Sequence, residues 1–322
     1  MKYGTMRENL LSLTCVLPDG TIANCGSRAL KSSAGYDLTS LMTGSEGTLG
    51  VITEATVKLH PIPSFVTAAI CAFDSVHEAA EVVEAIQMCA VPVERCELLD
   101  ESSVAAFNQY TATRGGGNSS TKGMTQLPIK PTLFSELTGS STTAVQEQVD
   151  LTKSICLEEF NGSNFVFKNE EAERKALWAA RHELYYASLA LRPGATSAIL
   201  TDACVPLSKF ASLITSTVEE IEKANVVGPC FGHAGDGNFH AIFPVLDTDS
   251  QEYLNKIHAL NDELIARTIE AGGTCTGEHG VGYGKIKYLS QQYGEGGVEM
   301  MRRVKTGLDP FNIMNPGKVV IL

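Results

Sequence analysis

The sequence predicts an α+β fold in two parts, and three observations lead to this prediction. Residues 50–60 alternate as a strand does, and the run ends at Pro61 and Pro63, which indicate a domain boundary. Residues 66–167 then follow the order β-α-β, β-α-β, the ferredoxin-like arrangement of an antiparallel sheet with helices on one face. The last third combines long helices with two glycine-rich segments, FGHAGDGNFH at 231–240 and GEHGVGYGK at 277–285.

The first part is predicted to consist mainly of strands. Residues 9–17 and 21–25 flank Pro18-Asp19-Gly20, a turn sequence typical of a hairpin. In the strand over 50–60, Val51, Ala55 and Leu59 share one face. We therefore expect a small sheet before the proline boundary.

The second part begins with strands expected over 66–73, 93–99, 132–137 and 164–167. Ser75 and Glu78 form a capping box that starts a helix, and its apolar stripe is Val76, Ala79, Val83 and Ile86. A second stripe, Val145, Val149, Thr152 and Cys156, predicts another helix. Longer helices are expected at 171–191, 206–224 and 250–271.

The insertion at about 107–130 contains RGGGNSSTKG. Its lysine lies near glycines, but the spacing does not match G-x-x-x-x-G-K-[ST]. We therefore predict a mobile surface loop there rather than a phosphate-binding loop. No G-x-G-x-x-G follows a predicted strand, so a nicotinamide-binding Rossmann site is not supported.

Composition narrows the possible classes of protein. The chain has 322 residues, of which 43% are hydrophobic, enough for a sizeable core and two domains. A net charge of −12 without a basic run makes nucleic acid and anionic membrane surfaces poor candidate partners. No apolar stretch reaches the roughly 18 residues of a membrane span. Nine cysteines without a C-x-x-C pair indicate reduced, mostly buried thiols.

His233 and His240 stand seven residues apart, a spacing that places them on opposite faces of a straight strand. Gly235-Asp236-Gly237 between them can turn the chain, since glycine accepts positive φ freely. After such a turn, Asn238 and His240 would share a strand face. Taken alone, this segment suits two ordinary histidines as well as it suits a metal site.

The second glycine-rich segment favours the metal interpretation. Glu278 and His279 are adjacent and flanked by glycines. Two histidines with one carboxylate form a ligand set that suits zinc, manganese or iron and leaves positions open for a substrate. A further histidine could act as a base near neutral pH. The competing interpretation is a tight turn with a hydrogen-bonded histidine.

Arg181 and the segment GSEGTLG at 44–50 are two weaker candidates. A guanidinium can hold a substrate carboxylate through paired hydrogen bonds, although a surface arginine on an amphipathic helix is the simpler interpretation. The glycines of 44–50 can expose backbone N–H groups to a phosphate, or can form a turn that binds nothing.

These motifs together resemble a known family. The segment KSSAGYDLTSLMTGSEGTLGVITEATVKLHPIP at 31–63 resembles the second half of the FAD-binding, PCMH-type domain of vanillyl-alcohol oxidase-type flavoproteins. GHAGDGNFH, GEHGVG and LDPFNIMNPGK resemble the FAD-linked oxidase C-terminal domain of D-2-hydroxyacid dehydrogenases, in particular the D-lactate dehydrogenase (cytochrome) type. The resemblance implies a partial flavin domain at 1–63 and a substrate and metal domain at 64–322, with about 300–322 returning to the flavin domain.

The resemblance also implies a role for each candidate residue. Metal ligands fall on His233, His240 and Glu278, and the base on His279. Substrate contacts fall on Arg181 and Asn238. The flavin would be lined by Gly44, Ser45, Glu46, Gly47, Thr48, Gly50, Val51, Ile52 and Asn315. Leu200 stands where hydroxyglutarate enzymes have a lysine for a second carboxylate, which points to a monocarboxylate such as lactate.

The implied activity is FAD-dependent, metal-assisted oxidation of D-lactate or a related D-2-hydroxy acid, with electrons passed to cytochrome c or another carrier in the mitochondrion. Family members have an earlier half of the flavin domain with a glycine-rich loop for the pyrophosphate, so Met1 is expected to fall in mid-domain. The alternative is a truncated, non-catalytic metal-binding fragment or pseudoenzyme. A metallohydrolase with the same ligands would leave GSEGTLG unexplained.

Overall fold

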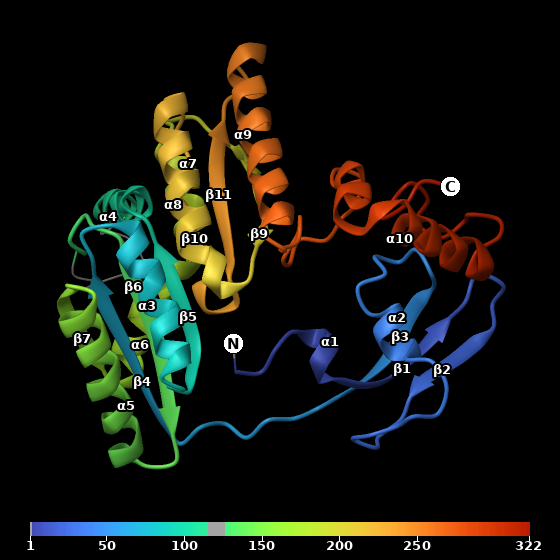
Figure 1. Cartoon of the computed structure of the whole chain (residues 1–322), viewed down its shortest axis with the longest axis horizontal. Coiled ribbons are helices and arrows are strands. Elements are labelled where there is room, and N and C mark those ends of the chain that lie inside the picture. The colour runs from blue at the N-terminus through green and yellow to red at the C-terminus, as the bar shows by residue number, and fades with distance from the viewer. Residues whose placement is uncertain (1, 115–125) are drawn as a thin grey trace. The chain divides into compact units, whose positions relative to one another are not determined.

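A computed structural model describes residues 2–114 and 126–322, which divide into two compact units (Figure 1). The first unit contains Lys2 and Pro63–Thr274. The second contains Tyr3–Ile62 and Cys275–Leu322.

The first unit is built on a ferredoxin-like core, as the sequence predicts. Its strands are β4 (Phe65–Ala72), β5 (Val93–Leu99), β6 (Thr132–Gly139) and β7 (Ser163–Lys168). They pair antiparallel in the order β7-β4-β6-β5. Helix α3 (Val76–Met88) follows β4, and helix α5 (Thr142–Ser154) follows β6. The α+β prediction is confirmed.

Two helix predictions in this core are confirmed in detail. Ser75 caps α3, and the Glu78 carboxylate accepts from the Ser75 N–H, which completes the capping box. The stripe residues of α3 are buried under the sheet. The second stripe runs through α5 into one π-helical turn, η1 (Ile155–Glu159), where Cys156 is also buried.

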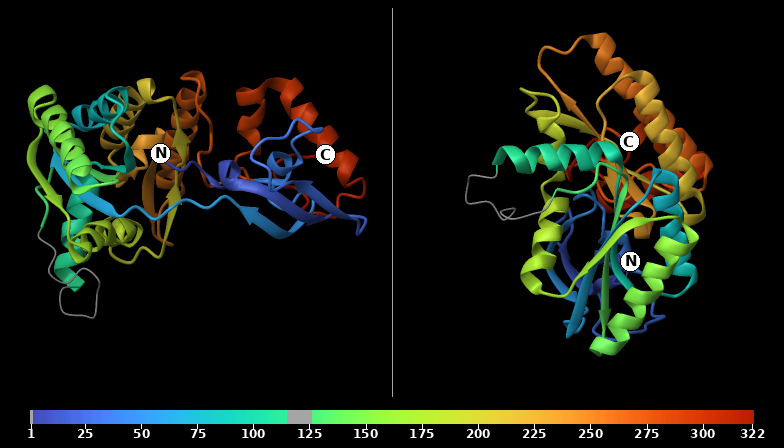
Figure 2. Two further views of the ribbon diagram at one scale, coloured as in Figure 1. Left: turned by 90° about the horizontal axis from the view of Figure 1, so that it is seen from below. Right: turned by 90° about the vertical axis from the view of Figure 1, so that its left-hand side faces the viewer.

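The sheet continues beyond the ferredoxin-like core. Strands β10 (Cys230–Gly232), β11 (Asn238–Val245) and β8 (Ser197–Leu200) extend it from β5, and β9 (Ala203–Cys204) pairs with β11. Helices α8 (Leu207–Ala224) and α9 (Gln251–Glu270) pack side by side (Figure 2), where Arg267 of α9 contacts Glu220 of α8 at 2.5 Å.

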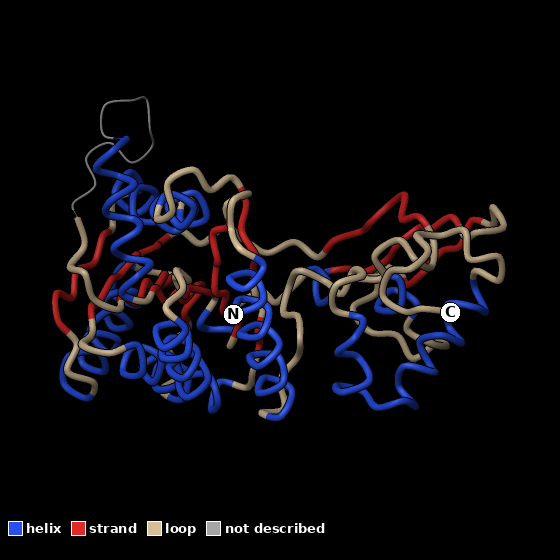
Figure 3. Tube along the Cα trace, turned by 90° about the horizontal axis from the view of Figure 1, so that it is seen from above, coloured by secondary structure: helices blue, strands red, loops and turns tan. Residues whose placement is uncertain are grey.

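Helices cover both faces of this sheet, whereas the sequence predicts only one covered face (Figure 3). Residues from α3, α5 and α8 pack on one face with Leu98 and Leu133. The opposite face carries Leu99 and Phe134, which pack against α4 (Glu101–Arg114), α6 (Glu171–His182) and α7 (Leu184–Ala190). Alternation along each strand separates the two sets of side chains.

Two boundary predictions are wrong. The surface loop expected from about 107 is helical as far as Arg114, because helix α4 begins at Glu101 and continues to that residue. The buried carboxylate of Asp100 caps the start of this helix by accepting the Ser103 N–H at 2.7 Å. Residues 115–125, with most of RGGGNSSTKG, lie outside the described part. The helix expected over 171–191 is two helices, α6 and α7, with Glu183 between them.

The second unit contains a three-stranded antiparallel sheet, β2-β1-β3, made of β1 (Leu10–Val16), β2 (Ile22–Gly26) and β3 (Val51–Val57). The predicted hairpin at Pro18-Asp19-Gly20 joins β1 to β2. Helices α1 (Met6–Asn9), α2 (Leu38–Met42) and α10 (Ile286–Leu308) complete the unit. The sequence analysis assigned no helix to α10, where Gly294 interrupts the helix at φ 67°.

None of the helices in the described residues combines the length and apolar character required to cross a membrane. Seven of the nine cysteines are buried, and all nine are free thiols, in line with the prediction.

Candidate active site

The turn in FGHAGDGNFH brings His233 and His240 together. Strand β10 ends at Gly232, a 3₁₀ turn, η2, spans Ala234–Asp236, and β11 begins after Gly237, whose φ is 72°. A Cβ on Gly237 would lie 2.1 Å from the Val205 carbonyl oxygen, so only glycine fits there. The two imidazole centroids are 6.4 Å apart with nearly perpendicular rings. The two histidines therefore converge within the first unit, as the turn predicts.

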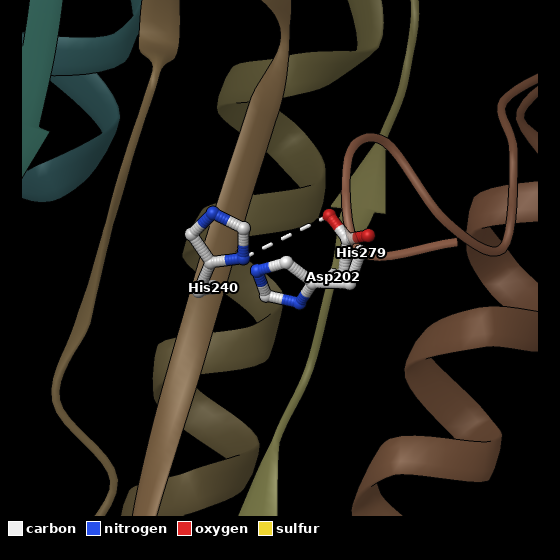
Figure 4. Close-up of side chains that lie close together, drawn as sticks. All are labelled: Asp202, His240 and His279. Carbon is white, nitrogen blue, oxygen red and sulfur yellow. Dashed lines mark ion pairs between the residues drawn. The ribbon is translucent and has the colours of Figure 1, made fainter. Parts of the chain in front are cut away.

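His240 is buried on β11, and its ring is oriented by backbone and carboxylate groups. Its Nδ1 donates to the Thr201 carbonyl oxygen at 3.0 Å, and an Asp202 oxygen lies 3.8 Å from the same atom (Figure 4). Thr201 is itself fixed, because its hydroxyl accepts from the Ala241 N–H at 2.7 Å. A carbonyl only accepts, so the proton of a neutral His240 lies on Nδ1 and its lone pair on Nε2.

Glu97 links His233 to Arg181. Oε1 of Glu97 lies 2.5 Å from Nδ1 of His233, and Oε2 accepts from Nε of Arg181 at 2.8 Å. The Arg181 guanidinium also stacks on Phe231 at 4.8 Å. The Arg181 side chain is only 15% exposed, so the interpretation as a surface arginine is wrong.

Glu97 remains ionised in this buried position. Burial by itself raises the pKa of the carboxyl, but the hydrogen bond from His233 and the charge of Arg181 outweigh it and lower the pKa. The sequence analysis did not identify Glu97 as a site residue. The available signal was a carboxylate two residues before Leu99 in the strand VERCELL, and therefore on the same strand face as that leucine.

Asn238 and Asp202 form a second buried polar pair beside His240. Nδ2 of Asn238 donates to Asp202 at 2.9 Å and to the Ala203 carbonyl at 3.2 Å. Across residues 2–114 and 126–322, Oδ1 of Asn238 is buried and has no hydrogen-bond partner. Such an atom calls for a water, an ion or a ligand. Asp202 was missed because a single aspartate after a short strand carries no motif.

The nitrogen and oxygen atoms of His233, His240 and Asn238 suit a divalent metal ion as ligands. Both histidines use Nδ1 for a protein acceptor, a carboxylate at His233 and a carbonyl at His240. That arrangement directs Nε2 toward a metal and is typical of metal-binding histidines. The orphaned Asn238 oxygen lies on the same strand face as His240.

Glu46 joins the two glycine-rich loops of the second unit. Its carboxylate accepts from the N–H groups of Val281 at 2.7 Å and Gly282 at 2.8 Å, and its own carbonyl accepts from Nδ2 of Asn315 at 2.5 Å. The Glu46 backbone has φ 54°. Its side chain thus anchors the segment that carries Glu278 and His279.

Glu278 and His279 lie partly exposed on that segment. An oxygen of Glu278 is 3.5 Å from Nε2 of His279. Both residues belong to the second unit, whereas His233, His240, Arg181 and Asn238 belong to the first.

The predicted flavin segment is a tight turn that leads into β3. Gly44 and Gly47 have φ of 79° and 69°, which favour glycine. Thr48 and Gly50 are buried, whereas Val51 and Ile52 are 53% and 44% exposed. The buried Lys305 donates to the Thr48 carbonyl at 2.9 Å and holds the turn.

Residues 62–319 match the family described as FAD linked oxidases, C-terminal domain, and the chain belongs to that family. It is 42% identical to a probable mitochondrial D-lactate dehydrogenase of Danio rerio, with 100% of this chain and 62% of the relative covered. Identity is also 42% to the mitochondrial D-lactate dehydrogenase [cytochrome] of Arabidopsis thaliana, covering 99% and 54%. The chain thus spans a little over half the length of these relatives.

Solved structures show the same fold. A p-cresol methylhydroxylase with substrate bound superposes with a TM-score of 0.71 at 16% identity, over 100% of this chain and 67% of that one. The 4-ethylphenol oxidase of Gulosibacter chungangensis gives 0.70 at 17% identity, over 97% and 66%. The predicted flavoprotein family and α+β fold are confirmed.

Proposed function

We propose that this chain belongs to an enzyme that oxidises D-lactate, or a related D-2-hydroxy acid, to the 2-oxo acid with FAD and a divalent metal. The observation that best supports this function is the convergence of Arg181 from α6 with Glu97, His233 and His240 from the adjacent sheet and turn. It places a carboxylate-binding cation beside two histidines that are oriented as metal ligands. The similarity to D-lactate dehydrogenases suggests the substrate class.

In this proposal Arg181 binds the substrate carboxylate through its guanidinium, which Glu97 and Phe231 hold in one orientation. His233 and His240 hold zinc, manganese or iron, and Glu278 completes the ligand set. Asn238 presents its unpartnered oxygen toward the substrate and the metal. A bound metal would supply Lewis-acid stabilisation of the developing alkoxide.

His279 is the proposed base. It takes the hydroxyl proton of the substrate, a role suited to an imidazole near neutral pH. The nine residues 44–48, 50–52 and 315 are the proposed flavin contacts, and Glu46 keeps their loop attached to the loop of His279. FAD, when bound, supplies the two-electron oxidation.

Leu200 and the relatives of the chain suggest the substrate size, the electron acceptor and the cellular location of the enzyme. Leu200 lies on β8 opposite Ile242, so this position offers no charge to a second carboxylate. We therefore propose a monocarboxylate. Relatives named D-lactate dehydrogenase [cytochrome], mitochondrial, support cytochrome c or another carrier as acceptor and a mitochondrial location.

Anaerobic flavin reduction tests the proposal. The purified chain should show a flavin absorbance band that D-lactate bleaches, while L-lactate and D-2-hydroxyglutarate should act poorly. His279→Ala should slow bleaching by about 100-fold or more, because general base catalysis contributes about that much. His182→Ala, on α6, serves as the matched histidine control.

Two outcomes would contradict the proposal. Unchanged bleaching in His279→Ala would remove the base from its role. A colourless chain that binds stoichiometric metal would instead support the alternative, a non-catalytic metal-binding fragment or pseudoenzyme.

A further inference from the structure

Glu97 is a buried carboxylate whose two oxygens bind two different candidate site residues. Oε1 binds Nδ1 of His233 and Oε2 binds Nε of Arg181. We infer that Glu97 is a positioning residue, which fixes the tautomer of His233 and the orientation of Arg181. The identity of the ligands, metal and 2-hydroxy acid, rests on the proposed function.

Strand register explains why Glu97 meets His233. Strands β5 and β10 pair antiparallel, with Leu99 opposite Phe231 and Leu98 opposite Gly232. The same register carried one residue further places Glu97 opposite His233. The pairing of the two strands therefore brings Glu97 to His233, which is the first residue after β10.

The carboxylate determines which nitrogen of His233 is available to a metal. An ionised carboxylate only accepts hydrogen bonds, so it draws the imidazole proton to Nδ1 and leaves the lone pair on Nε2. The neutral tautomer with its proton on Nε2 could not use that atom as a ligand. Glu97 thus selects the metal-binding tautomer before any metal arrives.

The second oxygen restricts Arg181. Nε is held by Glu97, and the guanidinium plane lies over Phe231. These two contacts fix the direction of the Nη groups, the part of the side chain that would bind a substrate carboxylate. One side chain therefore sets the geometry of both proposed subsites, and its loss should disturb both.

Glu97→Gln tests the inference because glutamine has one acceptor oxygen where glutamate has two. Because the Arg181 guanidinium has only donors, the glutamine oxygen is expected to face Arg181 and the NH₂ donor to face His233. His233 would then accept through Nδ1 and carry its proton on Nε2. Glu136→Gln is the matched control, since Glu136 is equally buried on β6 but binds Arg95 and Trp178.

Nitrogen-15 NMR of the histidines at a pH where they are neutral reads the tautomer without any metal or flavin. Wild-type His233 should carry its proton on Nδ1, and Glu97→Gln should move it to Nε2. His240, held by the Thr201 carbonyl, should keep its Nδ1 proton in both proteins. A wild-type His233 protonated on Nε2 would overturn the inference even if the variant did not fold.

Zn²⁺ affinity, measured by competition with a chelator, is the second readout. Glu97→Gln should weaken binding by about 10- to 100-fold, the usual effect of losing a partner of a metal ligand, and Glu136→Gln should not. Equal Zn²⁺ affinity in wild type and Glu97→Gln would overturn this inference and leave the proposed function standing. A wild-type chain that binds neither Zn²⁺ nor Mn²⁺ would overturn the metal part of the proposed function, and this inference with it.

Discussion

Nδ1 of His233 lies 2.5 Å from Oε1 of Glu97, although 136 residues separate the two positions in the sequence. The pairing of β5 with β10 creates this contact, and Arg181 from α6 occupies the other oxygen of the same carboxylate. The candidate site of the first unit is therefore a connected set of polar groups around the buried carboxylate of Glu97. Single substitutions can test how each residue contributes to metal affinity or to stability.

Loss of His240 should weaken metal binding strongly. His240→Gln removes the ring nitrogen that the Thr201 carbonyl orients, so Zn²⁺ affinity should fall by more than about 100-fold, the upper end of the effect of losing an outer partner. His258→Gln, at an exposed position on α9, should leave the affinity unchanged. Titration calorimetry measures both, and comparable losses in the two variants would contradict the assignment.

The buried carboxyl of Asp100 should make stability depend on pH. Burial raises its pKa to about 6, although hydrogen bonds from Ser103 lower it. Since the native pKa lies above the unfolded value of 3.8, the stabilisation is complete below about pH 4 and is lost as the pH rises through about 6. The free energy of unfolding should fall by about 3 kcal/mol over this range, because each pKa unit corresponds to roughly 1.4 kcal/mol.

Asp100→Asn should remove that dependence while it keeps a capping oxygen for Ser103. The unfolding free energy of the variant relative to wild type should therefore increase between pH 4 and 6, as urea denaturation would show. Glu101→Gln, at the neighbouring exposed position, is the control. Parallel pH profiles for wild type and Asp100→Asn would refute the prediction.

Gly237→Ala should destabilise the first unit strongly. The new Cβ would meet the Val205 carbonyl oxygen at 2.1 Å in a backbone with φ 72°, so both a clash and left-handed strain arise. Gly272→Ala shares the positive φ, 81°, but no described atom lies within 4 Å of its Cβ. We expect about 1 kcal/mol of destabilisation at Gly272 and clearly more at Gly237.

Thermal denaturation of the two alanine variants measures this difference. The first-unit transition should shift down further in Gly237→Ala than in Gly272→Ala. Equal shifts would mean that the turn relaxes without strain, and the requirement for glycine between the two histidines would then be lost.

Glu46→Gln should loosen the loop of Glu278 and His279. The carboxylate accepts two backbone hydrogen bonds, and charged acceptors form stronger bonds than neutral ones. Amide hydrogen exchange at Val281 and Gly282 should therefore become faster in the variant. Glu54→Gln, whose carboxylate accepts a hydrogen bond from the Thr14 hydroxyl and none from this loop, is the control. Unchanged exchange in Glu46→Gln would argue against the anchoring role.

The sequence by itself determined the features that depend on neighbours in the chain. The hairpin at Pro18-Asp19-Gly20, the Ser75–Glu78 capping box and the strand and helix order of the ferredoxin-like core are short-range patterns. The turn that brings His233 to His240 belongs with them, because glycines within the segment allow it. The family also follows from contiguous motifs.

Only the tertiary structure decided which distant groups meet. Glu97 and Asp202 carry no motif, and they become site residues through strand register and the packing of α6 against the sheet. Tertiary packing also determines the burial of Arg181 and the covering of the second sheet face by helices. Such contacts join residues far apart in the chain, and a local pattern holds no information about their partners.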